Sequence, residues 1–358
     1  MSRPIVSTLI DTFNHESYVE QAILSVLDQG LSEEEHEIVV IDDGSTDRTQ
    51  SIVRRFSPRV RYLRKENGGQ ASAFNAAFPQ LSGEVVALLD GDDWWVSKKL
   101  STVLDVFFKS KEIAAVGHGY FEVGDSGSAK EVVIPQWQCT LNLSSHEDAR
   151  LAAIGRTLLG TSRLAVRRKM LNAMGKLPEG LIFCADSPIF SLAFALGGAT
   201  VIDEPLCYYR LHSQNLFTRQ AYDADKMRQR QEMLVLLLDF LPGKLREFGI
   251  PDEIVRTFLE ADRIELDRYR VQMSGGRWDT FRTELRHTRW TQKNPTPGYL
   301  AFRGIVGLLA LGLPPKVFYK LLSVYGRLDL KRFRARLGRA EPRFSTTFIK
   351  RQPVTLVR

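Results

Sequence analysis

The stretch GEVVALLDGDD, residues 83–93, decides the fold class of this chain. Its centre, Val85–Leu89, is a continuous apolar run, which is typical of a strand buried on both faces of a parallel sheet. The run ends abruptly in Asp90-Gly91-Asp92-Asp93. In open α/β sheets, ligands bind beyond the carboxyl ends of the strands. The stretch therefore predicts an α/β domain with a binding site where this strand ends.

Two earlier segments repeat this layout of an apolar strand that ends in polar residues. Ile5–Ile10 leads into Asp11-Thr12-Phe13-Asn14, and Glu37–Ile41 leads into Asp42-Asp43. A helical apolar stripe follows the first segment at Tyr18–Leu27. Strands that alternate with helices in this way indicate a Rossmann-like, mostly parallel central sheet.

The acidic cluster after residue 89 suits a hard divalent cation. Carboxylate oxygens are ligands that Mg²⁺ and Mn²⁺ favour, and a nucleoside diphosphate can supply further oxygens. Gly91 lets the turn form and lets a ligand approach the backbone closely. The alternative interpretation is a solvated acidic turn that binds nothing.

Polar groups at the ends of the other strands can contact the rest of a nucleotide. Of Asp42 and Asp43, we expect one to cap a helix start and the other, Asp43, to contact the ligand. Thr12-Phe13-Asn14 can stack on and hydrogen-bond a base, or can form an ordinary loop. The Gly-Gly turn in Glu66–Asn75 opens a helix whose free N–H groups favour an anionic ligand, although a plain loop also fits.

Four segments together resemble family-2 glycosyltransferases with a GT-A fold. They are VSTLIDTFNHESYVEQAILSVLDQ (6–29), EIVVIDDGSTDRT (37–49), ENGGQASAFNAAF (66–78) and GEVVALLDGDDWW (83–95). The resemblance covers the N-terminal third and continues more weakly to about residue 218. It implies a bacterial-type, inverting, hexosyltransferase-like enzyme that uses a nucleotide-sugar donor, preferably a UDP-sugar, with Mn²⁺ or Mg²⁺ as cofactor.

The resemblance also assigns roles to residues near the donor. It places Phe13 and Asp43 against the base. It places Asp90 against the ribose or the metal, and makes Asp92 a metal ligand. The full set expected to contact the donor is Thr12, Phe13, Asn14, Asp43, Gly69, Gln70, Asn75, Asp90, Gly91 and Arg210.

A downstream segment, FCADSPIFSLAFALGG (183–198), supplies the expected catalytic base. Inverting transfer needs a carboxylate that takes the proton of the acceptor hydroxyl. Similar enzymes use an Asp at the start of a helix, which makes Asp186 the expected base. The alternative is that Asp186 only caps this helix.

Three further groups complete the expected site. The segment LCYYRLHSQNLF (206–217) resembles the family's Tyr-Arg-x-His segment, in which Arg210 and His212 approach the diphosphate or metal. We therefore expect His212 as a second metal ligand. Trp94 and Trp95 can form a platform for the acceptor sugar, or can pack in the core.

Three positions depart from the family pattern. Asp11 stands where the family often has proline, and Phe74 where many members have arginine, so the donor remains open. Ala185 stands where a Glu is usual, which keeps a catalytically silent sugar-nucleotide scaffold as an alternative. A sugar-nucleotide pyrophosphorylase is a second alternative, but the loop after the first strand lacks the basic, Gly-rich sequence expected of it.

The charge of the chain is unevenly distributed and suggests a separate role for the C-terminal part. Residues 1–210 carry 21 basic and 27 acidic residues, whereas residues 211–358 carry 28 and 15. We expect a GT-A catalytic domain at 1–218, a helical region at 219–292 and a basic amphipathic tail at 293–358. The last two form a C-terminal helical, basic appendage.

The tail has the composition of a segment that binds a membrane surface. Gly304–Pro315 is uncharged and too short to span a bilayer. A helical stripe with Val317, Phe318, Leu321, Leu322 and Tyr325 follows, and then the basic segment GRLDLKRFRARLGR (326–339). We expect peripheral contact with anionic lipid. A helix packed on the core and a homodimer arm are the alternatives, and no motif favours nucleic acid.

The N-terminus and the cysteines favour the cytoplasm. A strand follows directly after the first residues, which leaves no room for a signal peptide. Cys139, Cys184 and Cys207 form no C-x-x-C pair. We therefore expect a cytoplasmic enzyme, peripheral on the inner face of the cell membrane. Its expected acceptor is a glycan or a lipid-linked saccharide in cell-surface polysaccharide synthesis.

Overall fold

The computed structural model describes residues 3–124, 127–132, 140–156, 160–212, 215, 224–291 and 297–327. Contacts divide the chain into two compact units. The N-terminal unit comprises Met1–Phe217, Phe240–Ile254 and Phe344–Arg358, and the helical unit comprises Thr218–Asp239 and Val255–Arg343. The division at residue 239 falls within one long helix, α8 (Ala224–Glu247). The basic sequence from residue 328 onward lies outside the described residues.

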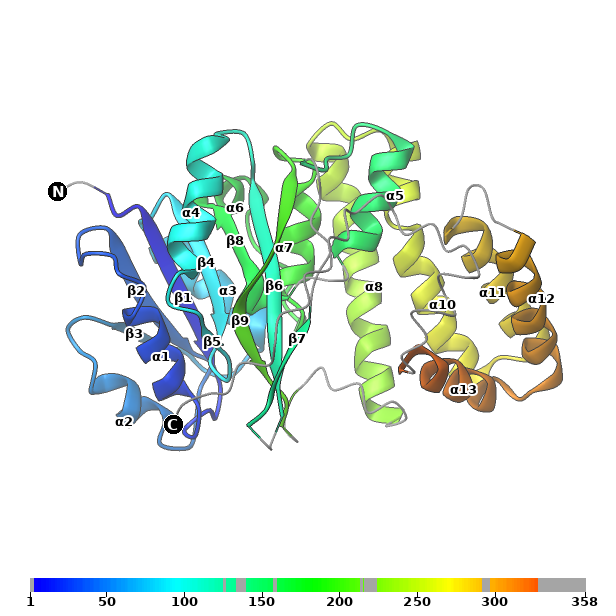
Figure 1. Cartoon of the computed structure of the whole chain (residues 1–358), viewed down its shortest axis with the longest axis horizontal. Helices are drawn as coiled ribbons and strands as arrows, with labels where there is room; N and C mark the ends of the chain where they lie inside the picture. The colour runs from blue at the N-terminus through cyan, green and yellow to red at the C-terminus, as the bar shows by residue number, and fades with distance from the viewer. Residues whose placement is uncertain are drawn as a thin grey trace. The chain divides into compact units, whose positions relative to one another are not determined.

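Within the described residues, nine strands form one sheet in the N-terminal unit (Figure 1). They are β1 (Val6–Thr12), β2 (His36–Asp42), β3 (Arg61–Arg64), β4 (Val85–Asp90), β5 (Trp94–Trp95), β6 (Ala115–Val123), β7 (Ala129–Val132), β8 (Leu164–Arg167) and β9 (Ala199–Arg210). The order is β3-β2-β1-β4-β8-β6-β9-β5, and β7 pairs with β6. The strands from β3 to β4 are all parallel, as expected. The other half is mixed, because β8 runs antiparallel to both β4 and β6.

The parallel half brings the polar strand ends to one edge. The three apolar runs are buried, with Leu9, Val40 and Leu88 fully enclosed. The register pairs Asp11 of β1 with Asp90 of β4, and Thr12 of β1 with the last residue of β2. Adjacent parallel strands lie about 4.8 Å apart, so side chains at paired positions meet. The fold therefore gathers the predicted acidic groups at one place.

Helices connect the strands of the N-terminal unit. They are α1 (Val19–Leu27), α2 (Thr49–Arg54), α3 (Gln70–Ala77), α4 (Lys99–Lys109), α5 (His146–Gly155), α6 (Arg168–Met174) and α7 (Asp186–Ala193), with α9 (Asp252–Phe258) at the unit boundary. A short 3₁₀ turn, η3 (Thr161–Arg163), precedes β8. Phe74, at the position where the family often has arginine, is fully buried and stacks on Phe78 with ring centroids 5.2 Å apart.

The helical unit is built around a buried ion cluster. It contains α10 (Glu260–Ser274), α11 (Arg277–Thr291), α12 (Pro297–Gly312) and α13 (Pro315–Arg327). Glu284 of α11 is 1% exposed and accepts two hydrogen bonds from Arg268 of α10, at 2.8 and 3.0 Å. Arg303 of α12 donates to the same carboxylate at 3.0 Å. This carboxylate therefore links three helices of the unit.

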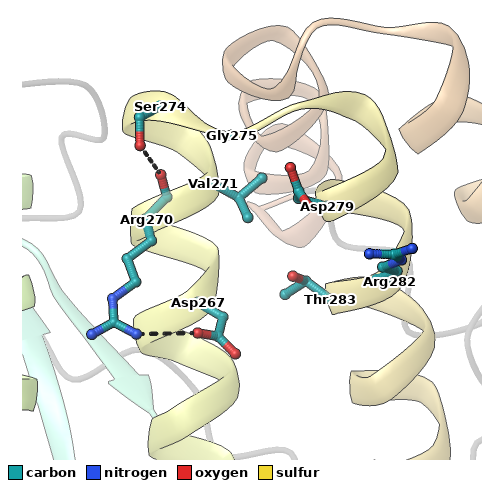
Figure 2. Close-up of a pocket in the computed structure, with 8 residues that line it drawn as sticks. All are labelled: Asp267, Arg270, Val271, Ser274, Gly275, Asp279, Arg282 and Thr283. Atoms are coloured by element: carbon teal, nitrogen blue, oxygen red, sulfur yellow. Dashed lines mark hydrogen bonds and ion pairs between the residues drawn. The ribbon is translucent and has the colours of Figure 1, made fainter.

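A groove of about 420 Å³ lies between α10 and α11 near the turn that joins them (Figure 2). Asp267 and Arg270 form an ion pair at 3.6 Å on one side of it. On the other side, Asp279 accepts a hydrogen bond from the N–H of Gly276 at 3.0 Å. These three charged groups therefore have partners within the helical unit. Among the helices in the described ranges, none is both long and apolar enough to cross a bilayer.

We expect the Glu284 cluster to be a main source of stability in the helical unit. Replacement of Glu284 by Ala leaves two largely buried arginines without their carboxylate, which should lower the free energy of unfolding by about 3–5 kcal/mol. The matched control is Glu247→Ala, which removes an exposed pair with Lys244 and should cost less than about 1 kcal/mol. Urea denaturation followed by circular dichroism measures both. Equal effects of the two substitutions would contradict this account.

Candidate active site

Three carboxylates meet where β4 ends. Oxygen atoms of Asp90, Asp92 and Asp93 all lie within 4.8 Å of one another. Asp93 is 1% exposed and is fixed by Ser162 of η3, whose hydroxyl donates at 2.6 Å, and by the N–H of Arg210 at 2.9 Å. Asp93 therefore orders the turn, which leaves Asp90 and Asp92 facing the site.

Asp11 adds a fourth carboxylate, beside Asp90. Its Oδ1 is buried and has no hydrogen-bond partner within the described part of the chain. Burial raises the pKa of Asp11 to about 7. Burial, followed by the charges of Asp11 and Asp92, also raises the pKa of Asp90 well above its ordinary value. Crowded carboxylates of this kind are stabilised by a cation.

The cluster has the donor set that a divalent cation requires. All its ligand atoms are carboxylate oxygens, which suit Mg²⁺ or Mn²⁺ better than softer metals. His212 lies next to it, with Nε2 3.0 Å from Oδ2 of Asp92. Burial acts to raise the pKa of Asp92, but the hydrogen bond from His212 and the charges of His15 and His212 together hold that pKa below its ordinary value. The residues present therefore fit a divalent cation. Asp90 and Asp92 would be its ligands, and His212 lies close enough to Asp92 to be a further one.

Gln70, the first residue of α3, connects the carboxylates to the expected base. Its Nε2 lies 3.3 Å from Asp11 and 3.1 Å from Asp90. The same nitrogen lies 3.2 Å from the hydroxyl of Thr161. Its Oε1 accepts a hydrogen bond from the N–H of Ala185 at 2.9 Å, one residue before Asp186. One side chain thus ties the end of β4 to the start of α7.

Asp186 lies at the first position of α7 and is only 9% exposed. Burial raises its pKa to about 6, opposed by the charge of Arg163 and by nearby backbone N–H groups, including that of Thr161. A carboxylate with such a pKa is ionised at neutral pH and still basic enough to accept a proton. Ala185, the residue before it, is the N-cap of α7, and its side chain makes no capping hydrogen bond.

Arg210 is held by the turn that carries the acidic cluster. Its Nε donates to the carbonyl of Asp92 at 2.9 Å, and its guanidinium also binds the side chain of Gln21. The guanidinium lies 4.9 Å from the ring of Tyr18 and 4.5 Å from that of Trp94. Arg210 therefore lies close to the cluster, and its guanidinium supports the backbone of the turn.

The two aspartates at the end of β2 differ in their contacts. Asp42 accepts a hydrogen bond from the N–H of Ser45 at 2.7 Å, so it caps a turn before α2. Asp43 accepts from the N–H of Gly69 at 2.7 Å and from Lys65 at 2.8 Å. Gly69 has φ +84°, and a Cβ there would lie 2.5 Å from Cα of Ile182. Only glycine fits this loop, which Asp43 holds in place.

The loop after β1 is also fixed by its own side chains. Asn14 accepts a hydrogen bond from the N–H of Thr46 at 2.8 Å, and its own N–H donates to Ser45. The ring of Phe13, the residue before Asn14, is 42% exposed and available for stacking. Thr12 is buried against the acidic turn, since a Cβ on Gly91 would lie 2.8 Å from its hydroxyl.

Two expected site residues have structural contacts instead. Both amide atoms of Asn75 bind the backbone of Leu177, at 2.9 and 2.8 Å, so Asn75 anchors a loop. Trp95 is 3% exposed and its indole N–H donates to the carbonyl of Ser162, so it packs in the core. Trp94 stacks on Tyr208 with ring centroids 4.9 Å apart. Of the two tryptophans expected to contact the acceptor sugar, Trp94 is therefore the one outside the core.

Sequence reasoning missed several residues of this site. His15 lies 3.9 Å from Asp92 but carries no motif of its own. Thr161 and Ser162 come from a short turn about 70 residues after the acidic cluster, with no sequence pattern to mark them. Asp11 could have been found, because an acidic residue at a position where proline is usual is itself a signal.

Comparison with known proteins agrees with this site. The model of glycosyl transferase family 2 matches residues 7–172. An uncharacterized glycosyltransferase of Nostoc sp. is 33% identical over 217 residues, which cover 59% of this chain and 66% of that protein. The chain matches less than two thirds of the length of its first curated relatives.

Two solved structures share the fold. S. aureus TarS 1-349 in complex with UDP-GlcNAc has a TM-score of 0.55 at 20% identity, over 90% of this chain and 91% of that one. A mannosyltransferase of Pyrobaculum calidifontis in complex with GDP-Man and Mn²⁺ has a TM-score of 0.52 at 18% identity, over 91% and 85%. The fold is that of GT-A glycosyltransferases, and residues 7–172 of this chain carry the match to glycosyl transferase family 2.

Proposed function

We propose that this protein transfers a sugar, with inversion, from a nucleotide-sugar donor to a hydroxyl group of an acceptor. The observation that carries this proposal is the link through Gln70 between Asp90 and the residue before Asp186. It joins a cation-binding cluster to a buried carboxylate of raised pKa. Those are the two groups that inverting transfer needs, one near the leaving diphosphate and one near the attacking hydroxyl.

In this proposal, Asp90 and Asp92 hold Mg²⁺ or Mn²⁺, and His212 serves as a further ligand. When bound, the cation offsets the charge that develops on the departing diphosphate. Asp186 accepts the proton of the acceptor hydroxyl as its oxygen attacks the anomeric carbon. Gln70 fixes the turn before Asp186 relative to the acidic cluster. The base and the donor are thereby held at a constant separation.

The donor is a nucleoside diphosphate sugar, and we favour a UDP-sugar. The two structural neighbours were solved with UDP-GlcNAc and with GDP-Man, which share the diphosphate and differ in the base. The exposed ring of Phe13 offers the base a stacking surface. Asp43 orders the loop that begins α3. In this proposal its carboxylate also accepts a hydrogen bond from the ribose or the base.

The acceptor in this proposal is a glycan or a lipid-linked saccharide in cell-surface polysaccharide synthesis. Trp94 is half-buried and lies next to Arg210, so it can contact the apolar face of a sugar. We place the reaction in the cytoplasm, where nucleotide sugars are the donors and the thiols of Cys184 and Cys207 stay reduced.

Calorimetric titration with nucleoside diphosphates and their sugars, with and without Mn²⁺, tests the donor site. We expect metal-dependent binding of one of them, weakened at least about tenfold in Asp92→Ala because a cation ligand is lost. Asp105→Ala, an exposed carboxylate on α4, is the matched control and should bind as the wild type does. If no nucleotide binds to the wild type, the proposed donor site is wrong.

Replacement of Asp186 by Asn tests the base. The amide has a similar size but cannot accept the proton, so turnover should fall by about 10²–10⁴-fold while the Kd for the donor stays unchanged. Asp203→Asn, on an exposed part of β9, should leave both quantities unchanged. Unchanged turnover in Asp186→Asn would remove this residue from the mechanism. Donor binding by a wild type that is inactive on every acceptor would favour the silent scaffold.

The pH dependence of turnover follows from the raised pKa of Asp186. The base works as a carboxylate, so with a pKa of about 6 it is active above that pH and is lost by protonation below it. At saturating donor and acceptor, turnover should fall about tenfold per pH unit below about pH 6 and stay level above it. Donor affinity measured by calorimetry at each pH is the control. A flat profile down to about pH 4.5 would show that a base of this pKa is not used.

A further inference from the structure

Helix α12 presents an uncharged apolar face to solvent. Leu300, Ile305, Leu308 and Leu309 are 51%, 58%, 72% and 44% exposed. Their spacing, together with exposed small residues between them, follows one side of a helix. The opposite side, including Val306 and Ala310, packs in the core of the helical unit. The exposed side is therefore a continuous apolar stripe along α12.

No charged side chain interrupts this stripe. The one charged residue of α12 is Arg303, and it turns inward. Its guanidinium donates to the carboxylate of Glu284 at 3.0 Å and to the hydroxyl of Thr288 at 2.5 Å. The charge of α12 is thus neutralised inside the helical unit, and the outer face keeps only apolar groups. In Figure 1, α12 is the orange helix that follows α11.

Helix α13 places cations beside exposed apolar groups. The sequence predicted one stripe along this helix, but Phe318 and Leu322 pack into the core of the unit. Val317 and Leu321 instead remain 45% and 51% exposed. The lysines at positions 316 and 320, each one residue before them, are exposed as well.

We propose that the outer face of α12, with the exposed side of α13, docks on the surface of an anionic lipid bilayer. At 16 residues, α12 is about 24 Å long, too short to span the bilayer but suited to lie in its interface. From Arg327 to Arg358 the sequence contains ten basic residues against Asp329 and Glu341. Apolar side chains that are followed in the sequence by many basic residues suit a bilayer, because anionic headgroups lie above its hydrocarbon.

The size of the stripe favours a bilayer over a second copy of the chain. A single helix face about 24 Å long and about 10 Å wide offers roughly 240 Å². A stable dimer interface buries about 800 Å² on each partner. A bilayer needs no complementary shape, and its affinity grows with each apolar side chain that enters it. This surface does not depend on the donor site, so it can be tested apart from the proposed reaction.

Vesicle flotation of the full chain tests the surface. The vesicles are phosphatidylglycerol–phosphatidylcholine mixtures, with phosphatidylcholine alone for comparison. The wild type should bind the anionic vesicles, and the double variant Ile305→Asp/Leu308→Asp should bind them roughly tenfold more weakly or worse. Both sites are exposed, so the fold should be retained, which circular dichroism checks. The matched control, Phe108→Asp, changes a 60% exposed apolar residue on α4 and should bind as the wild type does.

A second double variant tests how much the exposed lysines of α13 contribute to binding of anionic vesicles. Lys316→Ala/Lys320→Ala should weaken binding to anionic vesicles and flatten its dependence on salt, with little effect on neutral vesicles.

Three outcomes would overturn the proposal. The first is a wild type that does not bind anionic vesicles, and the second is a double variant on α12 that binds as tightly as the wild type. The third is a wild-type dimer, measured by light scattering, that becomes monomeric in the α12 variant while lipid binding stays unchanged. That third result would assign the face to a second copy. Donor titration of the α12 variant should match the wild type, so failure here is distinguishable from failure of the proposed reaction.

Discussion

The whole site depends on one electrostatic constraint: the half-buried carboxyl groups of Asp11 and Asp90 lie at paired positions at the ends of β1 and β4. The parallel register leaves them no other arrangement, because each is paired with the other at the strand ends. Gln70 is the group that contacts both, with Nε2 at 3.3 and 3.1 Å. An amide nitrogen offers only two hydrogens, so it cannot neutralise two buried charges. Burial is the main cause that raises the pKa of both carboxyl groups, and the charge of Asp92 adds to it.

Three basic side chains near the acidic cluster have other partners. Lys65 binds Asp43, and Arg210 supports the backbone of the turn. Lys99 is fully buried, donates to the carbonyl of Ser162 and lies 3.3 Å from the ring of Trp95. A donor diphosphate that approached this edge would add negative charge to a site already rich in it. A divalent cation relieves both repulsions at once, which is the physical reason for proposing one.

Patterns along the sequence predicted the strands and the acidic cluster, because burial on both faces requires continuous apolar runs. The contacts of Asp43, Asn75 and Trp95 could not be predicted from such patterns. Each depends on a partner far along the chain, such as the backbone of Leu177 for Asn75. The stripe expected on α13 was misjudged for a related reason. Amphipathicity shows that a helix has an apolar side, but neighbouring helices decide which apolar residues are covered.

Two carboxylates of this molecule differ in how the surrounding chain treats their charge. Glu284 is enclosed by Arg268 and Arg303, so its charge is satisfied within the protein and its role is structural. Asp90 is half-buried with carboxylates as neighbours, and burial, followed by the charges of Asp11 and Asp92, raises its pKa well above its ordinary value. The outer face of α12 presents the opposite case, because it exposes apolar side chains to water and carries no charge. A folded chain retains such unsatisfied surfaces at a cost in stability, and the cost is recovered when the matching partner binds.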